Sequence, residues 1–391
     1  MLYQSSESMT PVKVRAVIPR QELKAATTLL NKVIDRRNTI PILGYLRIEV
    51  RNNQVILKAT DLDAELTITL EAETEGEADI MVAARILAGF APTAAGPVTL
   101  SLIAKQDMDE IRLDDGETII TLNDHMPAAD YPALTSPKLH PAFSISQDQA
   151  SRLIRLSQHC ISNEETRYYL NGIFLTADPE RGTVRAVATD GHRMARIDTD
   201  EPADLSGIPG DERKGVIIPR AYVGALHAIF GKGGNEPVSF ALAESHLRVE
   251  CANVELRCKT IDGTYPDYAR VIPPISQAMR AQLSGPALKR MAALAEQICS
   301  SSWSIVELNL GDGRMIAKSP HAAEGSRASV PLQGDVAEGC VHKSLGFNIR
   351  YLSAQGSVTP SFTLSTLGPG EPARIVSDDP NALWVLMPAR L

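Results

Sequence analysis

The feature that most constrains the fold of this chain is an internal threefold repeat. An apolar strand-like run that leads into a helical pattern at an arginine occurs at Arg85, Arg220 and Arg350, which are 135 and 130 residues apart. The segments KATDLDAELT and VATDGHRMAR also match, and their aspartates, Asp61 and Asp190, are 129 residues apart. One third of the 391 residues is about 130, so the chain is predicted to hold three copies of one structural unit.

Proline-containing segments recur at the same spacing. Tyr131-Pro132 and Tyr265-Pro266 are 134 residues apart, and each is followed by a stretch with further prolines. Such stretches are typical of linkers. We therefore predict three domains of about 130 residues, each large enough to bury a core of its own.

Each predicted unit opens with an amphipathic helix. Apolar residues recur at three- and four-residue steps in residues 18–34, 146–162 and 286–299. Short alternating or β-branched runs such as QVILKA and ETIITL lie between the helices. Aromatic residues make up only 5% of the chain, so the cores must be mainly aliphatic. The pattern predicts the α+β class, with two helices packed on antiparallel sheet in each domain.

Charge is distributed unevenly along the chain. The 39 Lys and Arg residues against 47 Asp and Glu give a net charge of −8, which argues against a surface that is basic all over. The six predicted helical windows nevertheless carry +9, so the remainder carries −17. Helices of this kind either share one positive face for phosphates or are ordinary solvated helices, and charge alone favours neither.

Composition argues against several other classes of protein. No run approaches the roughly 18 to 20 apolar residues of a spanning helix, and the start MLYQSSESMT does not resemble a signal peptide, so we expect a cytoplasmic protein without a membrane partner. No phosphate-binding glycine motif and no metal-binding histidine pair occurs, so we expect no cofactor. The cysteines form no C-x-x-C pair and predict neither disulfides nor zinc; they are Cys160, Cys251, Cys258, Cys299 and Cys340.

The segment most like a catalytic one is ATDGHR, residues 188–193. Asp190 and His192 have the chemistry of an acid–base pair that could act with Cys160. However, the chain has no G-x-S-x-G elbow, and the Thr-Asp pair recurs at Asp61. We interpret the repeated pair as a structural turn in which the side chains satisfy backbone donors. A hydrolase or transferase that uses Cys160 or His192 is the disfavoured alternative.

Tyr168 and Tyr169 are adjacent in a chain that has few aromatic residues. One interpretation is a strand with one ring facing inward and the other outward, which residue type alone favours. The other is a loop that contacts nucleic acid, because an aromatic face stacks on any base.

Several segments together resemble the bacterial DNA sliding clamp, the β subunit of DNA polymerase III. RYYLNG, ATDGHR and the MP-x-RL terminus are together very specific to that family, and the matching segments span almost the whole chain in the family's order. They are residues 39–44, 59–62, 167–172, 187–193, 265–268, 346–348 and 387–391.

The resemblance implies a non-enzymatic processivity factor that encircles duplex DNA. Two copies would join head to tail into a six-domain ring, with the helices lining the hole and the sheets outside. The DNA is then held by topology and contacted through phosphates without sequence preference. The residues to which the resemblance gives a DNA-contacting role are Arg37, Arg85, Tyr168, Tyr169 and Arg220.

The resemblance also implies a pocket between the second and third domains for short, partly apolar peptide motifs. Its partners would be the replicative polymerase α subunit, the clamp loader δ subunit, repair polymerases and ligase. One or two buried anchors imply roughly micromolar affinity. The implied pocket residues are Leu170, Thr189, Gly191, His192, Arg193, Met194, Pro266, Arg270, Val271, Asn348, Tyr351, Val385, Met387, Pro388 and Arg390.

Two departures from the family pattern stand out. About ten residues precede the family's usual start, so we expect a disordered extension followed by three clamp domains, at residues 1–11, 12–137, 138–273 and 274–391. Glu164 and Glu165 precede the two tyrosines, where an acidic pair would repel phosphate.

Overall fold

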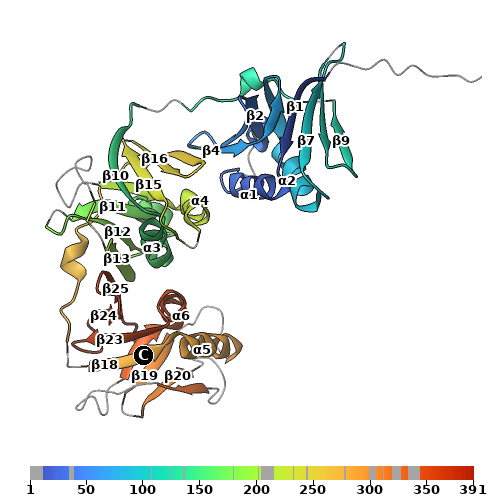
Figure 1. Cartoon of the computed structure of the whole chain (residues 1–391). Coiled ribbons are helices and arrows are strands. Elements are labelled where there is room, and N and C mark those ends of the chain that lie inside the picture. Colours follow the sequence, from blue (N-terminus) through green and yellow to red (C-terminus); the bar gives the residue numbers. More distant parts are fainter. Residues whose placement is uncertain are drawn as a thin grey trace, which may run out of the picture. The chain divides into compact units, whose positions relative to one another are not determined.

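Three successive parts of the chain share one order of elements (Figure 1). Each runs strand, helix, four or five strands, helix and three strands. The predicted threefold repeat is therefore present in the secondary structure. The computed structural model describes residues 12–34, 39–106, 108–123, 125–134, 137–178, 180–200, 202–203, 215–231, 233–243, 245–276, 279–298, 305–310, 312–318, 327–332 and 344–391.

The first repeat contains two α-helices and a series of strands that pair antiparallel. Its elements are β1 (Val12–Ile18), α1 (Arg20–Leu30), η1 (Pro41–Gly44), β2 (Tyr45–Arg51), β3 (Gln54–Thr60), β4 (Ala64–Glu71), β5 (Glu73–Glu75), β6 (Ala78–Ala83), α2 (Ala84–Thr93), β7 (Val98–Ile103), β8 (Glu110–Asp114), β9 (Ile119–Leu122) and η2 (Ala128–Asp130).

The second repeat adds three short 3-10 segments to the same plan. Its elements are β10 (His140–Ser146), α3 (Gln147–Ser157), η3 (Gln158–Cys160), η4 (Glu165–Leu170), β11 (Gly172–Asp178), β12 (Thr183–Thr189), β13 (Arg193–Asp198), β14 (Gly215–Pro219), α4 (Arg220–Phe230), β15 (Pro237–Leu242), β16 (His246–Cys251), β17 (Val254–Lys259) and η5 (Tyr268–Val271).

The third repeat follows the plan to the C-terminal residues. Its elements are β18 (Met279–Ser284), α5 (Gly285–Ile298), β19 (Ile305–Asn309), β20 (Arg314–Lys318), β21 (Arg327–Pro331), β22 (Ser344–Asn348), α6 (Ile349–Val358), β23 (Ser361–Thr366), β24 (Ala373–Val376) and β25 (Ala382–Leu386).

The chain divides into two compact units that do not coincide with the repeats. Unit 1 is Met1–Gln147 with Gly224–Thr260, and unit 2 is Asp148–Val223 with Ile261–Leu391. The reason is that sheets continue from one repeat into the next. The predicted boundaries of three domains therefore stay a prediction.

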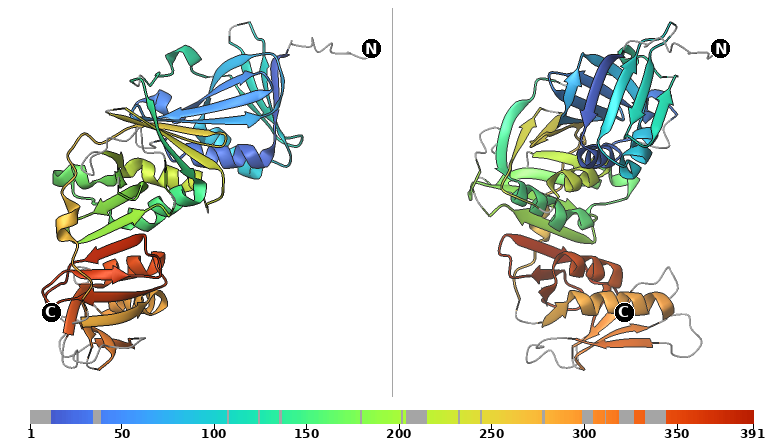
Figure 2. Two further views of the ribbon diagram at one scale, coloured as in Figure 1. Left: turned by 60° about the vertical axis from the view of Figure 1, so that its left-hand side comes forward. Right: turned by 45° about the vertical axis from the view of Figure 1, so that its right-hand side comes forward.

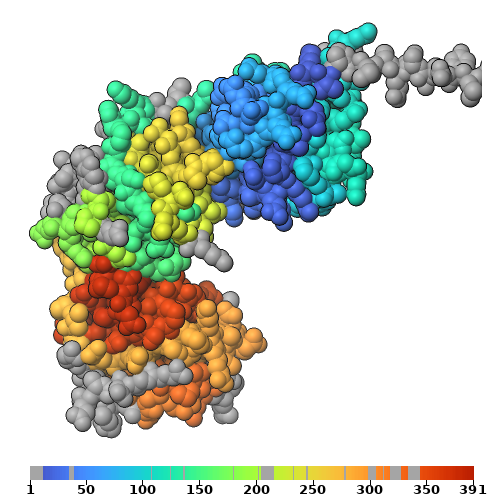
Figure 3. Space-filling view, in the orientation of Figure 1, coloured from blue at the N-terminus to red at the C-terminus, as the bar shows by residue number. Residues whose placement is uncertain are grey.

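Unit 1 contains two of the four sheets that the described strands form. One has the order β5-β1-β7-β8-β9, and the other has the order β10-β15-β16-β17-β4-β3-β2-β6. The second is continuous because β17 pairs antiparallel with β4, with Leu256 opposite Leu66. Figure 3 shows the strands of residues 237–259, in yellow, packed against the blue first repeat.

Unit 2 is built in the same way. Its larger sheet has the order β14-β11-β12-β13-β25-β24-β23-β18, and its smaller sheet has the order β21-β20-β19-β22. Here β13 pairs antiparallel with β25, with Met194 opposite Val385. This pairing brings the second and third repeats together.

The helices pack as their apolar spacing predicts. In α1 the residues Leu23, Ala26 and Leu30 are buried along one face. Helix α1 contacts α2, and α5 contacts α6, as Figure 2 shows for both pairs. The α+β class with helices on antiparallel sheet is confirmed. In the described part of the chain, no helix is long and apolar enough to cross a membrane.

The repeated Thr-Asp pair is a structural turn in both copies. Thr60 Oγ1 donates to the carbonyl oxygen of Ala64 over 2.7 Å, and Asp61 Oδ1 accepts from the backbone N–H groups of Asp63 and Ala64. Residue 62 then lies in the left-handed region, with Leu62 at φ +80°. The second copy has the same turn, with Gly191 at φ +88°.

We expect Leu62→Gly to stabilise unit 1 by about 0.5–1 kcal/mol. A left-handed conformation costs a side chain with a Cβ about 1–2 kcal/mol, and the greater flexibility of Gly in the unfolded chain offsets only part of that gain. Leu62 is 41% exposed, so little packing is lost. Denaturant unfolding measures the change. Leu62→Ala is the matched control, since it keeps the Cβ and should bring no gain; equal gains from both variants would contradict the explanation.

Candidate functional site

A cleft of about 260 Å³ in unit 2 gathers most of the predicted pocket residues. It is formed by η4, the turn between β12 and β13, η5 and the end of β25. Its lining residues are Arg167, Tyr169, Leu170, Thr189, Gly191, His192, Arg193, Met194, Pro266, Asp267, Tyr268, Val271, Val385 and Met387.

The Thr-Asp turn forms one wall of this cleft. Thr189 Oγ1 donates to the carbonyl oxygen of Arg193 over 2.8 Å, and Asp190 Oδ1 accepts from the backbone N–H groups of His192 and Arg193. Asp190 is therefore occupied in holding the turn, which confirms the structural interpretation of the repeated pair. The turn presents Gly191 and His192 to the cleft.

The floor of the cleft is apolar and well packed. Leu170, Met194 and Val385 are buried in a cluster that also contains Tyr265. The ring of Tyr265 stacks on Phe174 with centroids 4.7 Å apart. Such a floor can bury aliphatic or aromatic groups from a partner but offers no reactive group.

Two arginines line the cleft, and a third, Arg270, pairs with a carboxylate that lines it; each of the three is paired with a carboxylate three residues earlier in the chain. Such local pairs leave the rim with balanced charge. The Nε-to-carboxylate distances are 2.8 Å for Arg167 with Glu164, 2.9 Å for Arg193 with Asp190 and 2.9 Å for Arg270 with Asp267.

Five predicted pocket residues do not line this cleft: Arg270, Asn348, Tyr351, Pro388 and Arg390. Tyr351 is nevertheless close, because its ring lies 6.3 Å from that of His192, and the Arg193 guanidinium carbon lies 4.4 Å from its centroid. Asn348 instead caps α6 by accepting from the backbone N–H of Arg350.

Four lining residues were missed by the sequence analysis. They are Arg167, Tyr169, Asp267 and Tyr268. Arg167 and Tyr169 belong to RYYLNG, and the other two follow Pro266 directly. Taking every residue of these two motifs as pocket-forming would have found them.

The predicted DNA-contacting residues lie in several different elements. Arg85, in the first turn of α2, and Arg220, at the start of α4, have exposed side chains. Tyr168 is 53% exposed, whereas Tyr169 is partly buried against the cleft floor. Arg37 lies outside the described residues.

The two tyrosines do not form a strand, so that interpretation was wrong. They lie in the 3-10 segment η4, with their rings edge to face at 5.8 Å. Glu164, the first residue of the acidic pair before them, is paired within the same segment. Hydrogen bonds from Arg167 and Thr166 hold the pKa of Glu164 below its ordinary value, so its charge is present but paired.

One of the positive side chains counted in the six predicted helical windows is buried. Arg152 of α3 is buried, and its guanidinium Nη2 pairs with Asp379 at 2.6 Å. The positive face of α3 therefore depends on Arg155, which is exposed. This reduces the positive charge that the windows offer to phosphates.

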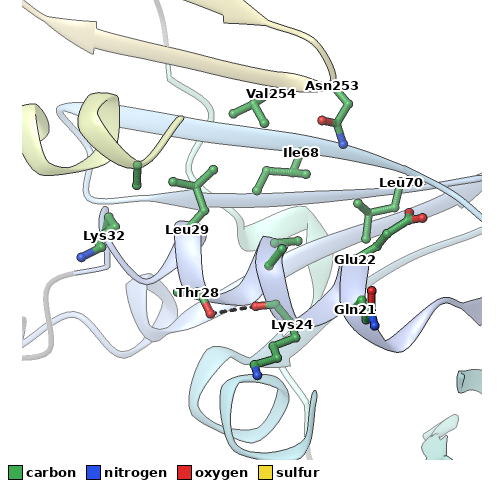
Figure 4. A pocket seen from close by; sticks show the side chains of 13 residues that line it. Gln21, Glu22, Lys24, Thr28, Leu29, Lys32, Ile68, Leu70, Asn253 and Val254 are labelled. Carbon is green, nitrogen blue, oxygen red and sulfur yellow. Dashed lines mark hydrogen bonds between the residues drawn. The ribbon is translucent and has the colours of Figure 1, made fainter. Parts of the chain in front are cut away.

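A larger cleft, about 650 Å³, lies in unit 1. Figure 4 shows Leu29 projecting from α1 toward Ile68 and Leu70 of β4, while Lys24 points away. None of the predicted site residues lines it. The smaller cleft of unit 2 is therefore the better candidate site.

The groups that the enzymatic alternative needs are poorly placed. Cys160 is buried, and burial raises the pKa of its thiol, so the reactive thiolate is disfavoured. Within the described ranges, no group of His, Cys, Asp and Glu side chains is arranged to hold a metal ion. His192 contributes to a cleft wall rather than to an acid–base pair, because Asp190 is occupied by the turn.

Comparison with known proteins identifies the family. Residues 14–135 match the N-terminal domain of the DNA polymerase III beta subunit, and residues 144–267 match its central domain. The beta sliding clamp of Caulobacter vibrioides is 30% identical over 97% of this chain and 100% of the relative. That of Vibrio cholerae is 28% identical over 97% of this chain and 100% of the relative.

Similar solved structures belong to the same family. A Caulobacter crescentus beta sliding clamp has a TM-score of 0.81 at 29% identity and covers 97% of this chain and 99% of its own. A Pseudomonas aeruginosa clamp bound to griselimycin has a TM-score of 0.82 at 26% identity and covers 97% of this chain and 100% of its own. The enzymatic alternative is therefore wrong. The chain belongs to the beta sliding clamp family, the β subunit of DNA polymerase III.

Proposed function

We propose that two copies of this chain close into a ring around duplex DNA and that the unit 2 cleft docks short peptide segments of DNA polymerase III and other replication proteins. As a family member the chain is a non-enzymatic processivity factor for DNA polymerase III. The single observation that carries the docking role is the apolar cleft, which combines buried floor residues with an open, charge-balanced rim.

DNA contact is assigned to Arg85, Arg220, Tyr168 and Tyr169, together with Arg37. The exposed arginines supply point charges for phosphates, and such contacts position DNA without reading its sequence. Pairing of Glu164 with Arg167 reduces the repulsion that this carboxylate would exert on a phosphate near Tyr168.

An exposed sheet edge supports an interface between copies. The sheet β5-β1-β7-β8-β9 ends at β9, where Ile119 is 57% exposed. Proteins rarely leave an apolar edge strand uncovered. We assign the closure of the ring to head-to-tail contact between two chains. Each chain contributes the three proposed domains, at 12–137, 138–273 and 274–391, so the ring has six.

The peptide partners are proposed as the replicative polymerase α subunit, the clamp loader δ subunit, repair polymerases and ligase. Their shared chemistry is a short segment with one or two aliphatic or aromatic anchors, which gives roughly micromolar affinity after the ordering cost. A solved C. crescentus relative holds polyethylene glycol at what is described for that protein as a putative beta-motif tethering region.

Deleting residues 387–391 is expected to weaken peptide binding at least about tenfold, because it removes Met387, an apolar lining residue of the cleft. Met387 lines the cleft, and its N–H donates to the carbonyl oxygen of His192 over 2.8 Å. Fluorescence anisotropy with a labelled polymerase peptide measures the change, and light scattering checks that the dimer remains.

Two point variants separate this effect from misfolding. Met387→Ala should show most of the loss without truncation. Leu367→Ala removes another exposed apolar side chain of unit 2, one that does not line the cleft, and it should bind like the unaltered chain. Peptide affinity that is the same in all three variants would count against the assigned site.

A further inference from the structure

An ion pair between Glu164 and Arg167 lies at the η4 side of the cleft. Arg167 lines the cleft, and its Nε and Nη2 atoms both donate to Glu164 Oε2, the first over 2.8 Å. Its Nη2 also reaches the carbonyl oxygen of Asp190 at 3.4 Å. The guanidinium therefore lies along the wall that contains the Thr-Asp turn.

The guanidinium also lies against Gly191. A Cβ at Gly191 would be 2.6 Å from Arg167 Nη1, so this glycine leaves room for the cation beside the cleft. Arg167 thus lines the cleft next to Gly191, where a docked peptide would contact it. A peptide carboxylate there would meet a cation already engaged by Glu164.

Glu164 differs from the other two carboxylates at the rim. Asp190 holds the backbone of its turn, and Asp267 itself lines the cleft beside Arg270. Among the described residues, the Glu164 carboxylate accepts hydrogen bonds from two side chains, Thr166 and Arg167. Its removal should therefore free a cation without disturbing the wall.

We propose that Glu164 is a charge mask that sets the selectivity of the cleft: by occupying Arg167 it makes binding depend on apolar anchors and removes the advantage of peptides with an acidic residue beside the anchor. This inference rests on the proposed peptide-docking function. Glu164 acts through Arg167 and is a positioning residue.

Exposure makes the mask exchangeable rather than permanent. The Glu164 and Arg167 side chains are 47% and 37% exposed, and a pair of this kind is weak because water competes for both charges. An acidic peptide that displaces Glu164 exchanges one ion pair for another and gains little. In a chain without the Glu164 carboxylate, the same peptide forms a new charge-assisted hydrogen bond.

The test compares two labelled peptides that are identical apart from one position next to a Leu-x-Phe anchor, aspartate in one and asparagine in the other. Binding is measured by anisotropy on the full chain. We expect the unaltered chain to bind both within about twofold. We expect E164Q to bind the aspartate peptide about fivefold more tightly with the asparagine peptide unchanged, and the gain to vanish near 0.5 M salt, about the range where exposed charges are screened.

Glu165→Gln is the matched control, because Glu165 is exposed next to Glu164 and its removal changes the net charge equally. E165Q should behave like the unaltered chain, and the double variant E164Q/R167Q should lose the gain. Equal shifts in E164Q and E165Q, or a gain for both peptides, would overturn the mask. Failure of the unaltered chain to bind either peptide would instead contradict the docking function, and the mask with it.

Discussion

A double-strand cut in circular DNA is expected to release this chain, whereas the uncut circle retains it. A ring around DNA has no end to slide from until the circle is opened, so its release depends on topology. In the experiment a clamp loader places the labelled chain on nicked circular DNA, gel filtration removes free protein, and a restriction enzyme then linearises half of the sample. Equal loss from circular and linear DNA would defeat the ring.

Salt separates a ring from an ordinary phosphate binder. A protein held by several phosphate contacts loses about 10³-fold or more in affinity between 50 and 200 mM salt. A ring of net charge −8 per chain relies little on such contacts, so its lifetime on closed circles should change little over this range. A control with Arg85→Ala and Arg220→Ala should load less efficiently yet stay on the closed circle once loaded. A steep salt dependence on closed circles would contradict encirclement.

Local patterns in the sequence predicted the elements well. The helix predicted over 286–299 is α5 at Gly285–Ile298, and the run QVILKA lies inside β3. These succeeded because the hydrophobic period is a local property. The pairings of β17 with β4 and of β13 with β25 were not predicted, since partner strands far apart in sequence leave no local signal.

The candidate site was predicted mainly through the resemblance. Ten of the fifteen predicted pocket residues line one cleft, because the β12–β13 turn and the end of β25 meet in the same sheet. The burial of Arg152 could not be foreseen, because its partner Asp379 is 227 residues away. The pairing of Glu164 with Arg167 depends on side-chain geometry in η4. The spacing of apolar residues does not predict such a contact in a short 3-10 segment.

Strand β13 connects the cleft to a buried ion-pair network. Breaking this network is expected to destabilise unit 2 strongly. Met194 near its start lines the cleft, and Asp198 at its end is fully buried. Arg185 of β12 reaches Asp198 over 2.6 Å and also pairs with Asp178. Buried charges of this kind are costly to leave without their partner.

Asp198→Ala is therefore expected to destabilise unit 2 by about 3–5 kcal/mol, because buried Arg185 loses a fully buried partner and Arg181 and Arg196 lose the same carboxylate. Amide hydrogen exchange in β12 and β13 measures the change locally, and unit 1 should keep its protection. The matched control is Asp79→Ala, which breaks the Arg47–Asp79 pair of unit 1 at 2.7 Å, where the Asp79 side chain is 42% exposed. That change should cost less than about 1 kcal/mol.

Peptide affinity gives an independent measure of the same coupling. Since β13 carries Met194 and pairs with the β25 strand that carries Val385, loosening its far end should raise the fraction of chains in which the cleft floor is open. Asp198→Ala should weaken peptide binding at temperatures where the chain is still folded. Unchanged exchange in β13 and unchanged affinity would mean that the pairing with β25 alone holds the floor, without help from the buried charges.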